Sequence, residues 1–393
     1  SRLLEEAARE FNARGIAGAS FARIARRMGL TRAALYYYVR DRDELAEQCY
    51  RHTCEVMAAD LAAASRTQGS GLECIVDFLR RALDTDRAPS AVLSELDYFH
   101  GRARQDMIAA HAANVMALRT LLRAGMSDGS IRLCDDLIAA QVLIGTLAWV
   151  PLSMDWVEGT DPAYRRRTVD ALTDLFVNGE VADRSWRFEP RVGISQFFAA
   201  PAGAFDRQAA QAAKIEALLM QASQLFNRRG IDGVSLDDVA DQVGATKGVL
   251  YHYFRNKTDL VVRCYRRAFT LYERFTDAAD AEPSAIDRAF TGTYLNIEAH
   301  VSGLSPLIQL VGVDALPAAA RREMTKRARQ LQQRFEAYGR QAHRDGQFRD
   351  IDFGTVAQLG AGAFEWLPKW LVPMPAGHIA REILSLFAYG LKA

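Results

Sequence analysis

Two short stretches of the chain carry side chains suited to contact a nucleic-acid groove. In the first, Arg32, Ala33 and Tyr36 lie on the outer faces of an expected helix, while Leu35 and Val39 point inward. A cation and aromatic hydroxyls can reach bases or phosphates, and a small residue lets the helix approach closely. This stretch therefore predicts a DNA-reading surface.

The second stretch repeats the pattern further along the chain. Its inward side chains are Leu250 and Phe254. Its outward residues are Lys247, Gly248, Tyr251 and His252. In both stretches the alternative is that the tyrosines only pack against the next helix. Tyr38 and Tyr253, which lie beside the buried face, fit that alternative best.

Both stretches belong to a unit that the chain contains twice. Residues 4–51 align without a gap on residues 219–266 at an offset of 215, and 20 of the 48 positions are identical. A second block, residues 93–151, aligns on residues 310–368 at an offset of 217. A period above 200 residues is too long for a solenoid, so the sequence predicts a duplicated domain.

Three short helices are expected to position each surface. An apolar stripe that includes Phe11 predicts the first helix, and Gly15 is placed to end it in a left-handed cap. Ser20 then begins a second helix that stops at Gly29, and Thr31 begins the third. A helix, a short turn with glycine and another helix make a helix-turn-helix arrangement.

The second copy contains the same signals. Ser235 begins its second helix with an acidic residue three positions later, which is typical of a capping box, and Thr246 begins its third. A fourth helix follows in each copy. At its start Arg42 and Lys257 are placed either to reach the phosphate backbone or simply to be solvated.

The stretch from Gly15 to Leu45, and still more closely the one from Gly244 to Leu260, resembles the DNA-binding signature of the tetracycline-repressor (TetR) family. The resemblance implies an all-helical fold with three N-terminal DNA-binding helices and a larger helical domain that binds a small molecule and dimerises. The DNA contacts that it implies, with the two capping serines, are Ser20, Thr31, Arg32, Ala33, Tyr36, Tyr37, Tyr38 and Arg42, and Ser235, Thr246, Lys247, Gly248, Tyr251, His252, Tyr253 and Lys257. Tyr37 and the early His252 depart from the family pattern, in which an aromatic residue is commonly followed by His and Phe.

Helix is also expected in the rest of the chain, because its apolar stretches have few Pro or Gly and none alternates like a strand. The sequence therefore predicts an all-α protein with two tandem TetR-like units. The expected domains are helix-turn-helix domains at 1–45 and 214–260, helical ligand-binding and dimerisation domains at 46–180 and 261–393, and a linker at 181–213. Aromatic residues in the linker, such as Trp186 and Phe197, predict that part of it packs on the surface.

One chain contains both halves of the interface that the resemblance implies for a dimer. The late helices of the two units are expected at residues 135–154 and 164–178, and at 352–371 and 378–391. We therefore expect an intramolecular pseudo-dimer that is monomeric, with further association left open.

Composition limits the cell compartment and the partners. The net charge of +1 means that any DNA contact must come from local patches. The absence of a signal sequence and five cysteines without a framework spacing favour the reducing cytoplasm. Leu137–Met154 has no charge over 18 residues, yet polar Gln141 and the charged Glu365 and Lys369 of its duplicate favour a buried helix over a membrane span.

The candidate ligand contacts are polar or aromatic residues in apolar helical contexts. They are Asp97, His100 and Trp149 in the first unit and Tyr294, Asp314 and Trp366 in the second, with His111, Asn114, Glu298 and Gln309 as further polar groups beside apolar faces. A polar group at a cavity wall can orient a ligand. The alternative is a helix cap or interhelix hydrogen bond for the aspartates and plain core for the tryptophans. No Cys/His cluster in the sequence predicts a metal site, and no motif predicts a cofactor.

The sequence favours a ligand-responsive transcriptional regulator, a repressor that recognises an asymmetric DNA operator and is released by a small hydrophobic molecule. An enzyme is disfavoured because the sequence has no nucleophile elbow, phosphate loop or Glu-x-x-His pair. The remaining alternative is a constitutive DNA-binding or architectural protein whose C-terminal halves only pair with each other.

Overall fold

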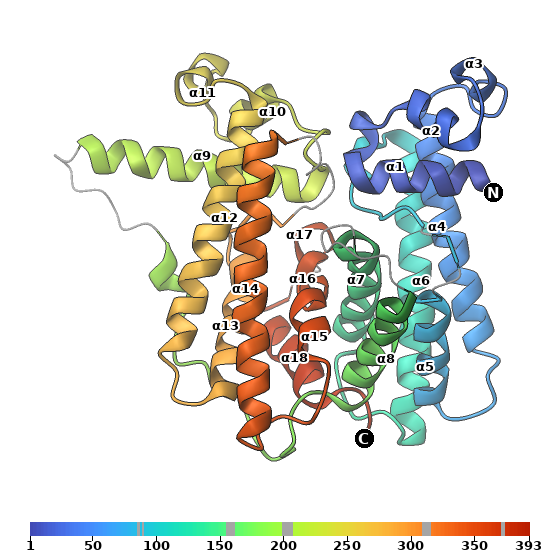
Figure 1. Ribbon diagram of the computed structural model, residues 1–393, viewed down its shortest axis with the longest axis vertical. Coiled ribbons are helices and arrows are strands. Elements are labelled where there is room, and N and C mark those ends of the chain that lie inside the picture. The colour runs from blue at the N-terminus through green and yellow to red at the C-terminus, as the bar shows by residue number, and fades with distance from the viewer. Residues whose placement is uncertain (85–86, 89, 155–161, 199–206, 309–315, 371–373) are drawn as a thin grey trace.

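The chain folds into helices that are arranged in two similar units. The computed structural model describes residues 1–84, 87–88, 90–154, 162–198, 207–308, 316–370 and 374–393. Within these ranges the regular elements are helices. Two isolated antiparallel backbone bridges also occur in these ranges, Ile131–Lys392 and Val181–Phe348. The all-α prediction is confirmed, and Figure 1 shows the units side by side.

Unit 1 begins with a three-helix domain, α1–α3, that we call head 1, and continues into a helical body. Its elements are α1 (Arg2–Gly18), α2 (Phe21–Met28), α3 (Arg32–Leu35), α4 (Arg42–Ala64), α5 (Gly71–Ala82), the 3-10 turn η1 (Leu96–Tyr98), α6 (Gly101–Asp128), α7 (Asp136–Met154) and α8 (Pro162–Asn178).

Unit 2 has the same order, with head 2 formed by α9–α11. After the linker turn η2 (Ile194–Phe197), its elements are α9 (Arg207–Arg229), α10 (Leu236–Gln242), α11 (Lys247–Tyr253), α12 (Lys257–Asp280), α13 (Ala285–Val301), α14 (Ala318–Arg344), α15 (Phe353–Leu359), α16 (Gly362–Glu365), α17 (Leu367–Trp370) and α18 (Ala376–Tyr389). Helix α9 begins within the segment expected to be linker, so the first helix of head 2 starts earlier than the predicted domain boundary at 214.

The expected helix ends follow from local hydrogen bonds. Gly15 has a φ of 72° and kinks α1, and Gly29 ends α2 at a φ of 74°. These are left-handed conformations that favour glycine. The hydroxyl of Ser20 accepts from the backbone N–H of Arg23, and Ser235 forms a full capping box with Asp238.

The two units meet through their late helices. In Figure 1, α7 and α8 of unit 1 lie against α15, α16 and α18 of unit 2, and one continuous apolar core contains residues of both units. Gly145 on α7 and its duplicate Gly362 on α16 permit this approach. A Cβ added to Gly145 would lie 2.7 Å from the carbonyl oxygen of Gly362. The uncharged stretch Leu137–Met154 lies within α7 and contributes buried residues to this core, in agreement with the predicted buried helix.

The linker packs on unit 2 where it is described. The ring of Trp186 lies 4.8 Å from that of Phe290, and the ring of Phe197 lies 4.8 Å from that of Phe275. The ion pair from Arg191 to the buried Glu282 adds a polar attachment. The apolar residues of the linker therefore serve packing, as the sequence predicted. Among the described residues, no helix is both long and apolar enough to cross a membrane.

Candidate nucleic-acid interface

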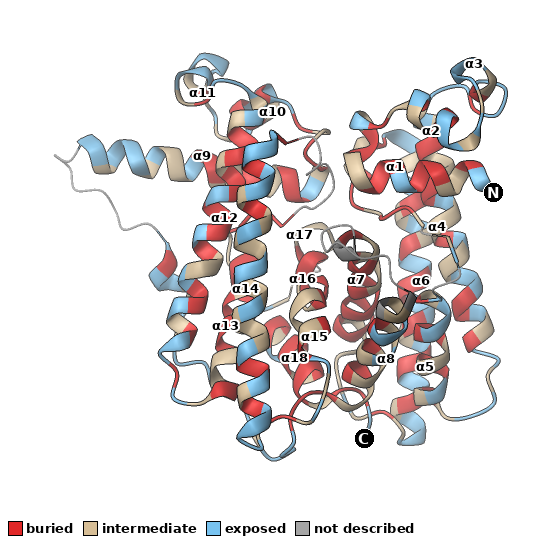
Figure 2. Cartoon of the chain, in the orientation of Figure 1, coloured by how far each residue is buried: buried red, intermediate tan, exposed pale blue. Residues whose placement is uncertain are grey.

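The two heads expose their third helices at the same end of the molecule (Figure 1). The predicted anchors Leu35, Val39, Leu250 and Phe254 are at most 2 % exposed. Every predicted outward residue is exposed, and they are Arg32, Ala33, Tyr36, Tyr37, Lys247, Gly248, Tyr251 and His252. In head 1 the helix α3 ends at Leu35, so Tyr36 and Tyr37 lie in the turn that follows it rather than on the helix. Figure 2 shows this exposed rim above the buried interior of each head.

Tyr37 and Tyr38 of head 1 are more exposed than Tyr253 of head 2, whereas Tyr36 and its equivalent Tyr251 are exposed to a similar extent. Tyr37 is 89 % exposed and Tyr38 is 62 % exposed, so in this structure Tyr38 is not buried against the next helix. Tyr36 is half-exposed, with its ring 5.6 Å from that of Phe21. In head 2, by contrast, Tyr253 is half-buried against the core of the head. Packing therefore describes Tyr253 but not Tyr38.

Arg42 and Lys257 each bond to the segment just before the second helix of their head, which is the end of α1 in head 1 and the turn after α9 in head 2. An Arg42 guanidinium N–H donates to the carbonyl oxygen of Ala17 at 2.6 Å, and the Lys257 ammonium donates to that of Asp232 at 3.3 Å. Ala17 and Asp232 are repeat equivalents, so the clasp is duplicated. Each cation links the fourth helix to the segment that precedes the second helix, a contact that neither sequence alternative included.

Head 1 has a buried carboxylate surrounded by arginines. Glu10 is fully buried and accepts from Nε of Arg23 at 2.7 Å and from the backbone N–H of Ser20 at 3.1 Å, with Arg27 at 3.5 Å. Its repeat equivalent is Leu225. Two of the arginines on α2 are therefore drawn towards Glu10, while Arg26 is exposed.

Head 2 places acids where head 1 has basic or neutral residues. The Lys247 ammonium lies 2.8 Å from the Asp237 carboxylate, and both side chains are exposed. Asp238 caps α10 and also contacts Arg229 at 3.2 Å. Helix α11 of head 2 therefore carries a paired cation, whereas the Arg32 guanidinium of head 1 contacts only the Tyr36 hydroxyl among the described contacts.

The heads meet at one buried carboxylate of unit 1. Glu95, just before η1, accepts from the backbone N–H of Ile16 in head 1 at 2.6 Å. A Cβ added to Gly230 in head 2 would lie 2.6 Å from the same carboxylate, so Glu95 fills the space between the heads. Burial raises the pKa of Glu95 to about 7, and the nearby Asp232 adds to the rise. The aligned position in unit 2 is Gly312, so this contact is not duplicated.

Below each head, one asparagine ties the first helix to a loop of the body. The Asn12 amide donates to the carbonyl oxygen of Ser90 and accepts from the N–H of Val92. The equivalent Asn227 makes the same two bonds, to the carbonyl oxygen of Pro306 and from the N–H of Ile308. Both asparagines are buried, and the pair of clamps joins each head to a cavity-lining loop.

Each body contains a cavity closed by a tryptophan of the other unit. The unit 1 cavity, of about 980 Å³, lies between head 1 and α4–α8 and is lined in part by Trp366. The unit 2 cavity, of about 270 Å³, lies among α12–α15 and is lined in part by Trp149. Two of the six candidate ligand contacts therefore line cavities, each in the unit to which it does not belong in sequence.

Three more of the six candidates, Asp97, His100 and Tyr294, line neither cavity. The Asp97 carboxylate pairs with Arg104 at 2.6 Å, and His100 is exposed at the start of α6. Tyr294 packs on Phe188 of the linker, with ring centroids 5.7 Å apart. Asp314 and Gln309 lie outside the described residues. Among the described residues, no group of three His, Cys, Asp or Glu side chains is placed to hold a metal ion.

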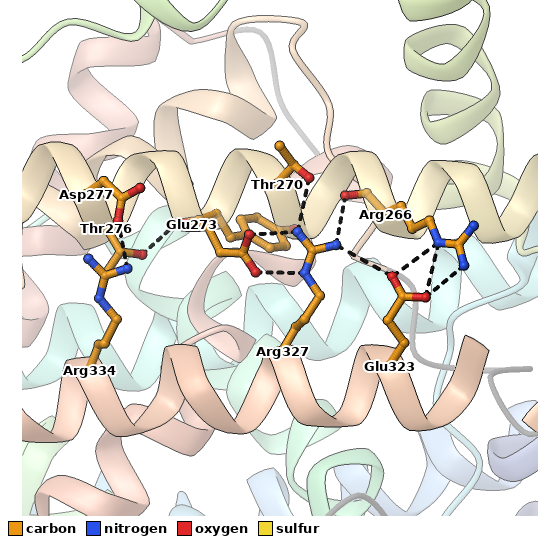
Figure 3. A network of polar contacts seen from close by, with 9 residues as sticks. Arg266, Thr270, Glu273, Thr276, Asp277, Glu323, Arg327 and Arg334 are labelled. Carbon is orange, nitrogen blue, oxygen red and sulfur yellow. Dashed lines mark hydrogen bonds and ion pairs between the residues drawn. The ribbon is translucent and has the colours of Figure 1, made fainter. Parts of the chain in front are cut away.

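Ion pairs made by three arginines join two helices that line the unit 2 cavity. Figure 3 shows Arg266, Arg327 and Arg334 paired across α12 and α14 with Glu323, Glu273 and Asp277, at 2.8, 2.7 and 2.9 Å respectively. In unit 1 the positions equivalent to Glu273, Arg327, Asp277 and Arg334 are all alanine, namely Ala58, Ala110, Ala62 and Ala117. The two bodies therefore differ in how their paired helices are held.

Two exposed third helices, each preceded by a capped helix and a glycine turn, define a helix-turn-helix protein. The model of bacterial regulatory proteins of the tetR family matches residues 3–49 and 218–264, and the tetracyclin repressor-like C-terminal domain matches residues 304–391. The chain belongs to the tetR family, in a tandem form with two N-terminal domains.

The curated relatives match part of the chain. The transposon Tn10 TetC protein of Escherichia coli is 32% identical over 60 residues, which are 15% of this chain and 30% of that protein. The HTH-type transcriptional repressor KstR2 of Mycobacterium tuberculosis is 31% identical over 87 residues, 21% of this chain and 44% of the relative. The chain thus spans less than half the length of each.

Similar solved structures also match part of the chain. The KstR2 structure has a TM-score of 0.40 at 21% identity and covers 46% of this chain and 95% of its own. The structure of AibR in complex with isovaleryl coenzyme A and operator DNA has a TM-score of 0.39 at 22% identity, with 45% and 99% covered.

Proposed function

We propose that the protein is a ligand-responsive transcriptional repressor that reads two different DNA half-sites with one chain. The observation that carries this proposal is the pair of exposed reading helices with different outward residues on one rigid frame. Arg32, Ala33 and Tyr37 face outward in head 1 where Lys247, Gly248 and His252 do so in head 2. The curated name of KstR2, a transcriptional repressor, supports the direction of regulation.

Different side chains at these places favour different bases. Arginine offers a planar fork that suits guanine, while lysine is a flexible point charge. Alanine can touch a thymine methyl group, which glycine cannot. In a homodimer the two-fold axis imposes identical half-sites, but a single chain with two different heads is free of that constraint. We therefore expect an operator that is not a perfect inverted repeat.

The chain is proposed to act as a monomeric pseudo-dimer. The late helices of the two units already bury each other's apolar faces, and backbone hydrogen bonds such as Glu180 to Phe387 and Arg132 to Leu391 join the units. A second chain would have to displace these contacts to pair in the same way. Sedimentation should show one chain at micromolar concentration, and an obligate dimer would contradict the proposal.

A small hydrophobic effector is proposed to bind in the unit 2 cavity. Aromatic rings dominate its wall, including Phe269, Tyr272, Phe290 and Phe335. Leu307 and Ile308 also line it, and Ile308 is held to head 2 by Asn227. An occupant that shifts this loop changes the position of α9, so the ligand favours one arrangement of the heads over another.

Selection of binding sequences from random duplexes tests the DNA-reading part. We expect a bipartite sequence with unlike halves, and selection of a perfect inverted repeat would contradict asymmetric reading. A thermal-shift screen of apolar small molecules tests the ligand response. Binders should raise the melting temperature and lower operator affinity. A protein that binds operator but responds to no apolar compound would instead be a constitutive DNA-binding protein.

A further inference from the structure

The two cavities occupy equivalent places but have different walls. Met57, His111 and Gln141 line the unit 1 cavity, and their repeat equivalents Tyr272, Ala328 and Gln358 line the unit 2 cavity. The duplication has therefore kept the position of the site while changing its lining. The change at His111 is the largest in chemistry, because an imidazole stands where the other unit presents a methyl group.

His111 is a buried polar side chain at the wall of the unit 1 cavity. It is 4 % exposed, and its Nε2 has no hydrogen-bond partner among the described residues. Its ring stacks on Trp370 of unit 2, with centroids 3.8 Å apart and an interplanar angle of 19°. Burial lowers the pKa of His111 to about 4, so the ring is neutral at pH 7 and can offer one donor and one acceptor.

Gln141 adds a second polar atom to the same wall. It is 5 % exposed, and its Oε1 has no hydrogen-bond partner among the described residues. Leaving a buried polar atom unpaired costs about 1–3 kcal/mol. A molecule that bonds to either group therefore gains a hydrogen bond that no described residue supplies. Apolar side chains such as Val92, Leu147 and Leu152 line the rest of this region.

Charged side chains that line the cavity already form ion pairs. The Arg87 guanidinium pairs with the Asp60 carboxylate at 2.5 Å, and the Lys369 ammonium pairs with Glu365. These paired charges favour an uncharged occupant, since a charged one would have to displace an existing partner. The unit 2 cavity differs again, because Ala328 places a methyl group where unit 1 has His111, and its own polar atom without a partner among the described residues is the hydroxyl of Tyr272, at the place of Met57.

We propose that the unit 1 cavity is a second effector site, selective for an uncharged molecule that joins an apolar body to a hydroxyl group, such as a phenol or an alcohol. The inference rests on the proposed ligand-responsive function and makes the protein a two-input regulator. The hydroxyl donates to Gln141 Oε1 or bonds with the neutral imidazole of His111. The unit 2 cavity takes the apolar effector. Because Trp370 comes from unit 2, an occupant beside His111 also bears on the contact between units.

A matched pair of probes tests this selectivity. Naphthalene and 2-naphthol share one apolar body and differ in a hydroxyl group. Each is titrated into the full chain, followed by its own fluorescence, for the wild type, His111→Ala and His111→Gln. His111→Ala installs the unit 2 residue, while His111→Gln retains a polar amide near the place of the imidazole nitrogen. Circular dichroism and operator binding verify that each variant is folded.

In the wild type we expect two classes of site, one of which prefers 2-naphthol by about tenfold, as one added hydrogen bond to a buried group predicts. His111→Ala should abolish that preference, and His111→Gln should restore most of it. The reciprocal Ala328→His should raise the preference of the unit 2 cavity for 2-naphthol over naphthalene.

Equal affinity for the two probes at every wild-type site would overturn the inference, as would a preference unchanged by His111→Ala in a folded variant, or a failure of both probes to bind. Operator binding without probe is measured on the same samples. Operator binding with no hydroxyl preference leaves the regulator in place and removes only this inference. Selective probe binding without operator binding would support this inference and contradict the proposed regulator.

Discussion

Head 1 and head 2 share one scaffold but distribute charge in opposite ways. In head 1 the arginines of α2 gather around the buried Glu10, and the exposed Arg26 adds positive charge. In head 2 the equivalent helix is acidic, and Asp237 pairs with the reading lysine Lys247. The inward anchors and the caps of the second helices are duplicated, because packing and capping fix them, whereas the outward faces differ.

The two heads show at which positions a duplicated protein can diverge. An anchor such as Leu250 has little choice of residue, since its neighbours fill the space around it. An outward residue such as His252 touches little of its own domain and is limited only by what it contacts outside. The two cavities follow the same rule, with position preserved and lining changed.

Removing an anchor should have the largest effect and should separate the heads. Leu35 and Leu250 are both fully buried, so Leu35→Ala or Leu250→Ala should cost about 2–5 kcal/mol, confined to the head that carries the change. DNase footprinting should show loss of one half-site for each variant and retention of the other. If both halves disappear together in either variant, the heads do not read separately.

Glu95 should make the contact between the heads sensitive to pH. Its pKa is raised from 4.5 to about 7 on folding, so the folded state holds the proton more tightly than the unfolded state. The protonated carboxyl therefore contributes up to about 3 kcal/mol to the free energy of unfolding. This contribution is complete below about pH 4.5 and is lost as the pH rises through about 7. Asp232, Lys257 and Lys369 are the charged groups that act on this carboxyl.

Glu95→Gln should flatten melting temperature against pH in that window, because the amide keeps an acceptor for Ile16 and cannot ionise. Glu180→Gln is the matched control. Its carboxyl is also buried, with its pKa raised to about 8, but it lies at the far contact between the bodies. Glu180→Gln should change the dependence of melting temperature on pH up to about pH 8. It should leave the spacing of the two DNA half-sites unchanged. Identical profiles for Glu95→Gln and wild type would remove Glu95 as the titrating group.

Exchanging the reading residues should make the heads alike. Arg32→Lys, Ala33→Gly and Tyr37→His together give head 1 the outward residues of head 2. Each changed base contact can discriminate by about 1–3 kcal/mol. Selection from random duplexes should then yield two similar halves. An unchanged preferred sequence would show that these positions do not read bases.

Changes of surface charge should have the smallest effect, seen only in the salt dependence of DNA affinity. Arg26→Asp installs the head 2 residue and should flatten the log–log slope by about 0.9 if Arg26 meets a phosphate. Asp237→Ala installs the head 1 residue, releases Lys247 from an exposed ion pair and should steepen the slope by a similar amount. A slope that stays constant in both variants would place both side chains outside the DNA contact.

The sequence alone determined the features that depend on near neighbours along the chain. The caps at Ser20 and Ser235 and the left-handed Gly15 and Gly29 are where their local signals placed them. The inward and outward faces of the third helices are also as predicted, because helical periodicity fixes them. The duplication was visible because both copies preserved these positions.

Which distant residues meet depends on how the helices pack. Glu95 reaches Ile16 of head 1 across 79 residues and also lies against Gly230 of head 2, and Trp370 of unit 2 stacks on His111 of unit 1. Asp97, by contrast, lies in a surface ion pair rather than at a cavity wall. These outcomes depend on how the helices pack in space, which periodicity does not encode. Periodicity tells which face of a helix is buried, but the angle and depth at which helices cross decide which side chain ends at a cavity and which is covered.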